Sequence, residues 1–102
     1  MNPENQNKSL QKKVYNIVKK IPKGKVTTYK NIGVEIKTKA YRAIGNALNK
    51  NTDFEKIPCH RVVRSNGEIG GYVKGKKAKE QLLKKEGITI KKGKITRLKN
   101  FL

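Results

Sequence analysis

Two short predicted helices, separated by the dipeptide Lys37-Thr38, constrain the fold of this chain more than any other feature. Thr28 is placed to cap the first helix, from Tyr29 to about Ile36, and Thr38 to cap the second, from Lys39 to about Asn49. The second helix carries residues small enough to let another backbone approach it closely: Ala40, Ala43, Gly45 and Ala47. Two short helices across a tight turn are typical of a helix-turn-helix, and an ordinary helical hairpin with its alanines in the core fits the pattern equally well.

The remaining segments predict a mainly helical α+β domain. Apolar residues at spacings of three and four predict a helix that starts at Ser9 and ends before Pro22, while the polar residues 1–8 are expected to be disordered. A further helix is predicted over residues 78–86. The sequence therefore predicts one domain that runs from residue 9 to residue 102.

Two short β-hairpins are predicted after the helix pair. Val62 and Val63 form the first strand, and the Asn66-Gly67 turn would return the chain through residues 68–72. Residues 88–98 predict a second hairpin around a basic loop. A solvated basic tail over residues 88–102 is the alternative for this end of the chain.

The charge of the chain points to a polyanionic partner. It has 26 basic and 7 acidic residues among 102, for a formal charge of +19. Such self-repulsion destabilises a compact fold unless a polyanion offsets it, and nucleic acid is the usual partner. An anionic membrane surface or a lysine-rich, thermophile-like surface are alternatives. No segment has the bulky apolar anchors of a membrane-bound amphipathic helix, so we expect nucleic acid and no membrane.

Cys59 and His60 are the only cysteine and the only histidine of the chain, and they are adjacent. The thiolate is the nucleophilic form of cysteine, and a neighbouring base raises its fraction at neutral pH. The alternative is an inert, buried cysteine beside a surface histidine. A single cysteine excludes an intrachain disulfide and a multi-cysteine zinc site. We therefore expect no metal, no cofactor and a reducing, cytoplasmic compartment.

The stretch Ile57-Pro58-Cys59-His60-Arg61-Val62 resembles the active-site signature of the O6-alkylguanine-DNA alkyltransferases. Further blocks fall in the order and spacing of that family: Thr28-Tyr29, Arg42-Ala43-Ile44-Gly45, Asn51, Gly71-Tyr72 and Leu82-Leu83 to Glu86-Gly87. The resemblance covers about residues 9–88. It implies a winged helix-turn-helix domain that binds duplex DNA through the minor groove and flips the damaged guanine into a pocket. The alkyl group would then pass from O6 to the cysteine, irreversibly and once per molecule.

The resemblance also implies four reacting groups. Cys59 would be the nucleophile, and His60 would act as its base through a water molecule. Glu86 would orient His60, and Tyr29 would donate a proton to the guanine ring as the leaving group gains charge. The alternatives are an ordinary surface glutamate for Glu86 and a core-packing aromatic residue for Tyr29.

A second implied set would contact DNA. Arg42 would enter the base stack in place of the flipped base, and Asn51 would brace the loop before the signature. The recognition helix would present a smooth face made of Ala43, Gly45 and Ala47. The alternative for Arg42 is one more phosphate-binding cation, and the alternative for Asn51 is a plain turn residue.

The resemblance places the flipped guanine against backbone groups. The carbonyls of Cys59 and Val62 would accept hydrogen bonds from its exocyclic amine, and the amide of Val73 would face O6. Tyr72 would form a wall of the pocket. Val73 is bulkier than the small residue common at its position, which implies a tighter pocket.

The chain departs from the family in one further respect. Most members carry an additional N-terminal domain, for which we expect no room in 102 residues. The short alkyltransferase-like proteins, which sense alkylated DNA without repairing it, typically carry tryptophan at the cysteine position. This chain keeps Cys59 and has no tryptophan. We therefore predict a monomeric DNA repair alkyltransferase. The alternatives are a non-catalytic sensor that recruits other repair factors and a basic DNA-binding regulator.

Overall fold

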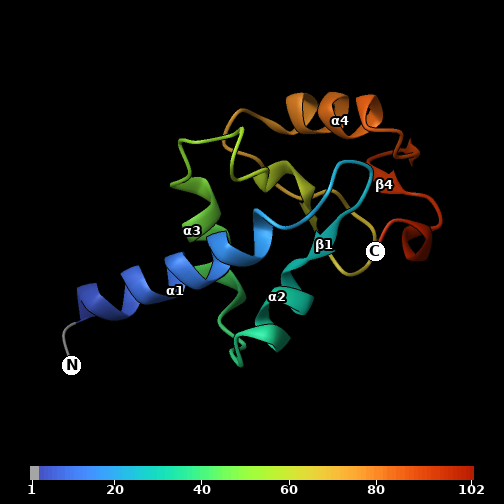
Figure 1. The fold of residues 1–102 in the computed structure, drawn as a ribbon. Coiled ribbons are helices and arrows are strands. Elements are labelled where there is room, and N and C mark those ends of the chain that lie inside the picture. The colour runs from blue at the N-terminus through green and yellow to red at the C-terminus, as the bar shows by residue number, and fades with distance from the viewer. Residues whose placement is uncertain (1–2) are drawn as a thin grey trace.

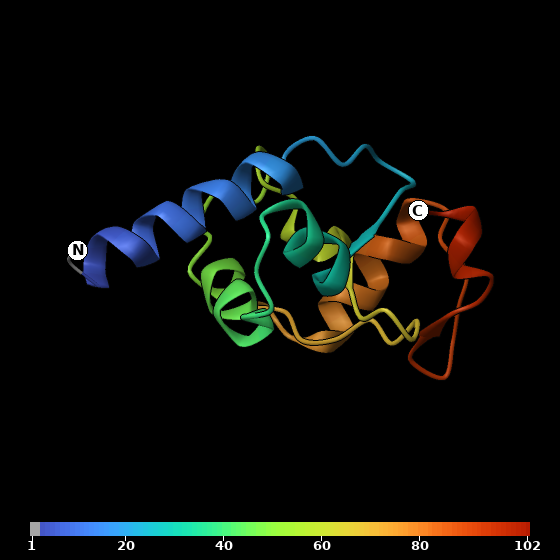
Figure 2. The same ribbon diagram turned by 90° about the horizontal axis from the view of Figure 1, so that it is seen from below.

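The computed structural model describes residues 3–102, an elongated molecule of 44 × 24 × 21 Å. Its elements in chain order are α1 (Pro3–Val18), β1 (Thr27–Thr28), α2 (Tyr29–Glu35), α3 (Tyr41–Asn49), the 3₁₀ turn η1 (Cys59–Arg61), β2 (Val62–Val63), α4 (Lys76–Lys85), β3 (Ile90–Lys91), β4 (Lys94–Ile95) and the 3₁₀ turn η2 (Leu98–Asn100). Helix α1 and the C-terminal segment lie at opposite ends, with α2, α3 and β1 between them (Figure 1 and Figure 2). The predicted mainly helical α+β fold class is confirmed.

Helix α1 begins at Pro3, which corrects the start predicted at Ser9. Proline is favoured in the first turn of a helix because its ring fixes a helical φ and its missing N–H has no partner there. Residues 3–8, which we expected to be disordered, therefore belong to this helix. Met1 and Asn2 lie outside the described residues.

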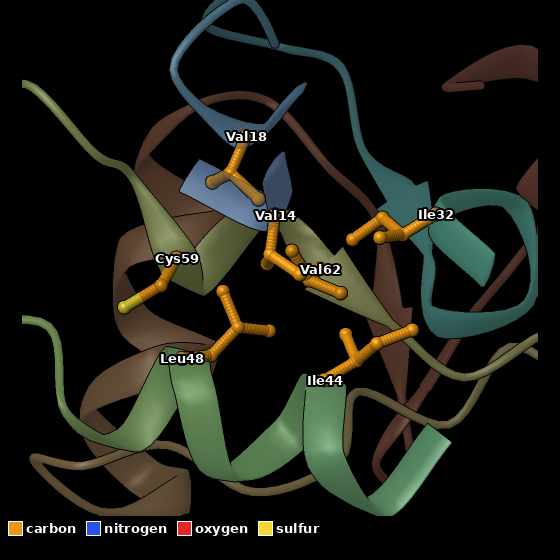
Figure 3. Packing of buried hydrophobic residues seen from close by; sticks show 7 residues of the cluster. All are labelled: Val14, Val18, Ile32, Ile44, Leu48, Cys59 and Val62. Atoms are coloured by element: carbon orange, nitrogen blue, oxygen red, sulfur yellow. The ribbon is translucent and has the colours of Figure 1, made fainter. Parts of the chain in front are cut away.

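The apolar stripe of α1 packs into the first of two hydrophobic clusters. Figure 3 shows its seven buried members, which come from α1, α2, α3, η1 and β2: Val14, Val18, Ile32, Ile44, Leu48, Cys59 and Val62. Full burial of one such aliphatic side chain stabilises a fold by about 1.5–3 kcal/mol. Cys59 is thus part of the core, although its sulfur points away from the other six side chains (Figure 3).

The helix-turn-helix consists of α2 and α3. Thr28 caps α2 as predicted, because its Oγ1 accepts a hydrogen bond of 3.0 Å from the amide of Asn31. The predicted start of the second helix at Lys39 is wrong, since α3 begins at Tyr41. The Thr38 hydroxyl instead accepts a 3.1 Å hydrogen bond from the amide of Ala40 and so stabilises the turn between the helices.

Gly33 lets this turn pack closely against α2. A Cβ at Gly33 would lie 2.7 Å from the carbonyl oxygen of Thr38 and 2.8 Å from Cε1 of Tyr41. We expect Gly33→Ala to lower the free energy of unfolding by about 1–3 kcal/mol, the usual cost of overpacking, when measured by urea denaturation.

Gly45→Ala in α3 is the matched control for the Gly33 variant. No atom lies within 4 Å of a Cβ built at Gly45. We expect this control to raise the free energy of unfolding by about 0.5–1 kcal/mol, because alanine favours the helix. Equal effects of the two substitutions would contradict a close approach at Gly33.

Strand β2 lies between two cores and pairs in parallel with β1, with Thr27 opposite Val62 and Thr28 opposite Val63. The predicted hairpin between β2 and residues 68–72 is therefore wrong. Val62 belongs to the first cluster and Val63 to the second, so the strand is buried on both faces. Strands of that kind occupy interior positions rather than exposed hairpin edges.

The chain after β2 turns as predicted but pairs elsewhere. The amide of Gly67 donates to the carbonyl of Arg64 at 2.9 Å, which closes the Asn66-Gly67 turn. Glu68 then forms a bridge with Lys94 of β4. The returning segment therefore joins the C-terminal hairpin.

The second cluster lies under α4 and the β3–β4 hairpin. Its buried members are Val26, Val63, Ile69, Leu83, Ile88, Ile90 and Ile95. Strands β3 and β4 are antiparallel, so the segment after residue 88 forms the predicted hairpin and not the alternative solvated tail. Helix α4 begins at Lys76, two residues before its predicted start. Within residues 3–102, no helix combines the length and apolar character needed to cross a bilayer.

Candidate active site

Cys59 opens the turn η1 directly after Pro58, and only 4% of its surface is exposed. It lines a cleft of about 750 Å³, a volume typical of sites for small molecules. Six residues that the sequence predicted to act on DNA or on the base meet in this cleft: Tyr29, Arg42, Gly45, Cys59, Tyr72 and Val73. They come from α2, α3, η1 and the loop before α4.

The other predicted site residues do not line the cleft. His60, Val62 and Asn51 are buried, and Glu86 is half-buried at the end of α4. Ala43 is half-buried, whereas Ala47 is buried, so Ala47 is not available on the surface of the helix as the predicted smooth face requires. The reason is that α3 turns Ala47 toward α1, where the carbonyl of Ala47 accepts a 2.6 Å hydrogen bond from the Tyr15 hydroxyl.

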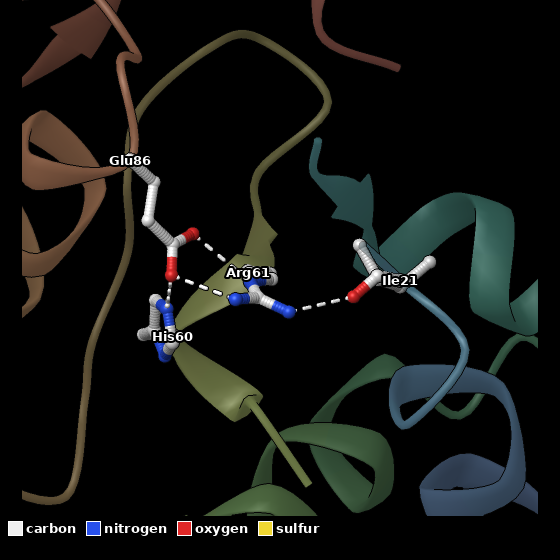
Figure 4. A network of polar contacts seen from close by, with 4 residues as sticks. All are labelled: Ile21, His60, Arg61 and Glu86. Atoms are coloured by element: carbon white, nitrogen blue, oxygen red, sulfur yellow. Dashed lines mark hydrogen bonds and ion pairs between the residues drawn. The ribbon is translucent and has the colours of Figure 1, made fainter. Parts of the chain in front are cut away.

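His60, Arg61 and Glu86 form a hydrogen-bonded network, which Figure 4 shows. Nε2 of His60 lies 2.9 Å from Oε2 of Glu86. Arg61 donates to both carboxylate oxygens, from Nε to Oε1 at 2.9 Å and from Nη2 to Oε2 at 2.8 Å. Such a bidentate arginine–carboxylate pair fixes the carboxylate in orientation. Nη1 of Arg61 also donates to the carbonyl of Ile21 at 2.7 Å, which attaches the segment after α1 to the network.

The protonation states in this network follow from burial and charge. Burial raises the pKa of Glu86, but the hydrogen bonds from Arg61 and His60 outweigh it, so the pKa lies below its usual 4.5. Burial lowers the pKa of His60 below 6.5, and Glu86 offsets this only in part. At pH 7 the carboxylate is therefore charged and the imidazole neutral. An imidazole whose Nε2–H donates to Glu86 keeps Nδ1 free to accept a proton.

Asn51 holds the loop that leads into η1. Its side-chain amide donates to the carbonyl of Ile57 at 2.7 Å, and its Oδ1 accepts from the amide of Asp53 at 2.9 Å. The residue is 2% exposed, so both bonds are protected from water. This geometry agrees with the bracing role that the sequence suggested for Asn51.

Two tyrosines and an arginine shape the cleft. Burial raises the pKa of Tyr29 and of Tyr72, so both phenols keep their protons at neutral pH. The ring of Tyr72 meets the rings of His60 and Phe54 edge-on, at centroid distances of 6.4 Å and 6.1 Å. Arg42 is exposed in the first turn of α3, where its side chain can leave the protein surface.

Sequence reasoning did not single out two charged residues that the structure bonds to the segments around the site. Arg61 holds Glu86, and the ammonium of Lys79 bonds to two backbone carbonyls from a fully buried position. Each looked ordinary among 26 basic residues. The only available signal for Arg61 was its place directly after His60. Among residues 3–102, no three His, Cys, Asp or Glu side chains cluster closely enough to hold a metal ion.

The site thus combines a helix-turn-helix, a cleft lined by a cysteine, and a histidine next to that cysteine in sequence that pairs with a glutamate, which is the arrangement expected of a DNA-associated domain of the alkylguanine family. Residues 9–88 match the family model described as "6-O-methylguanine DNA methyltransferase, DNA binding domain". This match spans most of the chain, and the chain belongs to that family.

Curated relatives agree with this assignment. A methylated-DNA–protein-cysteine methyltransferase of Saccharolobus islandicus is 52% identical over 77 residues, which cover 76% of this chain and 50% of that protein. The corresponding protein of Methanosarcina barkeri is 49% identical, over 74% of this chain and 49% of its own length. The chain thus spans about half the length of these relatives.

A solved structure covers almost the whole chain. S. pombe Atl1, in complex with damaged DNA containing O6-carboxymethylguanine, has a TM-score of 0.80 and 27% identity, over 93% of this chain and 94% of Atl1. The similarity therefore extends beyond the residues that the family model matches.

Proposed function

We propose that this chain is a DNA repair alkyltransferase that moves an alkyl group from O6-alkylguanine in duplex DNA to Cys59, once per molecule. One observation carries the proposal. Cys59 borders a cleft large enough for a base, and it is followed by a neutral histidine that a charged carboxylate holds in place. A nucleophile, a base and a residue that orients the base are the recurring parts of a thiol-based transfer site.

The proposed step moves one alkyl group and balances its protons. The Cys59 thiol gives its proton to Nδ1 of His60, directly or through water, and Glu86 stabilises the imidazolium that forms. The thiolate sulfur attacks the alkyl carbon, and the bond between that carbon and O6 breaks with its electron pair going to the guanine. Tyr29, whose burial keeps the phenol protonated, donates a proton to the base, and the proton held by His60 then returns through solvent to the Tyr29 phenolate. The products are a thioether at Cys59 and an unmodified guanine.

Duplex DNA fits the surface around the cleft. A formal charge of +19 favours phosphate contacts, and Arg42 projects from the start of α3 where the cleft opens. A base within a duplex does not expose O6 to a thiolate, so the alkylated guanine must leave the stack to enter the cleft. We assign Arg42 to the space that the base vacates.

A non-catalytic sensor of alkylated DNA is the second candidate. Its support is the similarity to Atl1, which extends over 94% of that protein. The presence of Cys59 at the cleft favours transfer over sensing, because binding alone has no use for a nucleophile beside a base.

Intact-mass spectrometry separates the two candidates. The chain is mixed with an equimolar duplex that carries one O6-methylguanine, and we expect each molecule to gain one methyl group. Peptide mapping should place that group on Cys59. An undamaged duplex is the control and should leave the mass unchanged. Tight, selective binding of the damaged duplex without any gain in mass would instead support the sensor.

A further inference from the structure

Lys79 of α4 is fully buried, with 0% of its surface exposed. Its Nζ donates to the carbonyl of Val62 at 2.6 Å and to the carbonyl of Gly71 at 3.0 Å. An ammonium removed from water is costly unless it is hydrogen-bonded, and an aliphatic side chain would satisfy the same helix position at lower cost. The presence of a lysine therefore indicates a need for two donors at this point.

The two carbonyls belong to different segments, of which only the one with Gly71 lines the cleft at this point. Val62 follows Cys59 by three residues, and Gly71 lines the cleft together with Tyr72 and Val73. We propose that Lys79 is a positioning residue that clamps the cleft wall formed by residues 71–73 to the segment that carries the nucleophile. The clamp sets the distance between a bound base and the Cys59 sulfur. This inference rests on the proposed function, because it assigns Lys79 to the same reaction.

The clamp is strongest while Lys79 is charged, since charge-assisted hydrogen bonds are roughly twice as strong as neutral ones. Burial lowers the pKa of Lys79 to about 7. A negative charge at Cys59 favours the ammonium, whereas Arg64 disfavours it. The Tyr29 ring, 6.0 Å from Nζ, adds a weak attraction, and the charge on Lys79 helps to keep His60 neutral.

Misplacement of the wall should affect transfer more than DNA binding. A base held about 1 Å from its productive position can lose about 100-fold in rate. The lysine itself does not line the cleft, so its replacement removes no contact with DNA. A positioning role therefore predicts a slow reaction from a normally formed complex.

The test compares Lys79→Met with Lys77→Met, which removes an equal charge from an exposed position of the same helix. Three quantities are measured on the full chain between pH 6 and 9. They are the single-turnover rate of methyl transfer at saturating O6-methylguanine duplex, the dissociation constant of that duplex, and hydrogen–deuterium exchange of the amides in residues 71–75. Thermal unfolding confirms that each variant is folded.

For Lys79→Met we expect transfer to slow by about 10- to 100-fold with little change in the dissociation constant, and exchange in residues 71–75 to accelerate. The ratio of the wild-type transfer rate to the Lys79→Met rate should be largest below pH 7 and should decrease at higher pH, as the ammonium deprotonates. Lys77→Met should match the wild type throughout.

If Lys79→Met transfers the methyl group and exchanges its amides at the same rates as the wild type, the clamp is overturned and the proposed function stays intact. A transfer defect with the same magnitude at every pH, and with unchanged exchange, would also overturn it, because residues 71–75 would then be held equally well without the lysine. Absence of transfer in the wild type would refute the proposed function instead. The exchange data would then decide separately whether Lys79 holds the wall.

Discussion

We expect Cys59→Ser to abolish the proposed alkyl transfer and to leave the binding of alkylated duplex nearly unchanged. Serine is similar to cysteine in size, so the cleft keeps its shape, but its hydroxyl does not ionise at neutral pH and is a much weaker nucleophile. The cleft and the exposed Arg42 remain in place. We expect no mass gain with O6-methylguanine duplex. The dissociation constant should change by less than about threefold, or about 0.65 kcal/mol.

Two measurements complete this experiment. Electrophoretic mobility shift with damaged and undamaged duplex gives the affinities, and intact mass gives the transfer. Because Cys59 is also a core residue, thermal unfolding of the variant must show that it is folded at the assay temperature. Methylation of the serine variant would mean that another residue is the acceptor, and this result would contradict the proposed mechanism.

Glu86→Gln has the second largest expected effect, a loss of about 100-fold or more in the transfer rate, because a positioned base contributes about 10²–10⁴-fold. The carboxylate only accepts hydrogen bonds, so it selects the His60 tautomer that has a proton on Nε2 and a free Nδ1. A glutamine amide can donate to Nε2 and stabilise the opposite tautomer, which cannot take a proton at Nδ1. Single-turnover kinetics at saturating duplex measure the loss.

Glu80→Gln is the matched control for Glu86→Gln. Glu80 lies on the same helix and pairs with Lys84 at 3.6 Å near the surface, where ion pairs contribute little. We expect its transfer rate to equal that of the wild type. A similar loss in both variants would show that the charge of α4, and not the orientation of His60, supports the reaction.

The same carboxylate gives the fold a pH dependence. The folded pKa of Glu86 lies below 4.5, so its contribution to stability is complete above pH 4.5 and is lost as the pH falls through the folded value. His60, whose folded pKa lies below 6.5, loses its contribution in the same direction below pH 6.5. In Glu86→Gln, the free energy of unfolding should therefore fall below that of the wild type near neutral pH. The difference should narrow in acid.

Local chemistry was readable from the sequence wherever a short segment determines its own structure. Thr28 capped α2 as predicted, because an N-cap involves only the next three residues. The meeting of Cys59, Tyr29 and Arg42 in one cleft could be predicted, because their sequence blocks keep the order and spacing of a known family. The C-terminal hairpin followed from two apolar segments on either side of a basic loop within residues 88–98.

Long-range pairing and burial were not readable in this way. The partner of β2 lies about 35 positions earlier in β1, and a local Asn-Gly turn offered a competing hairpin. Lys79 is one of several lysines in α4, the others of which are exposed, and only the tertiary fold removes it from water. Arg61 likewise gains its role from Glu86, 25 residues later.

The bond from Arg61 to Ile21 links the proposed reaction to the stability of the fold. Glu86, which orients the proposed base, also holds Arg61, and Arg61 bonds to the segment that follows α1. The orientation of His60 and the attachment of the segment after α1 therefore depend on the same carboxylate. If the proposed function holds, loss of this carboxylate would remove the partner that orients His60 and would also free the Arg61 side chain that bonds to Ile21.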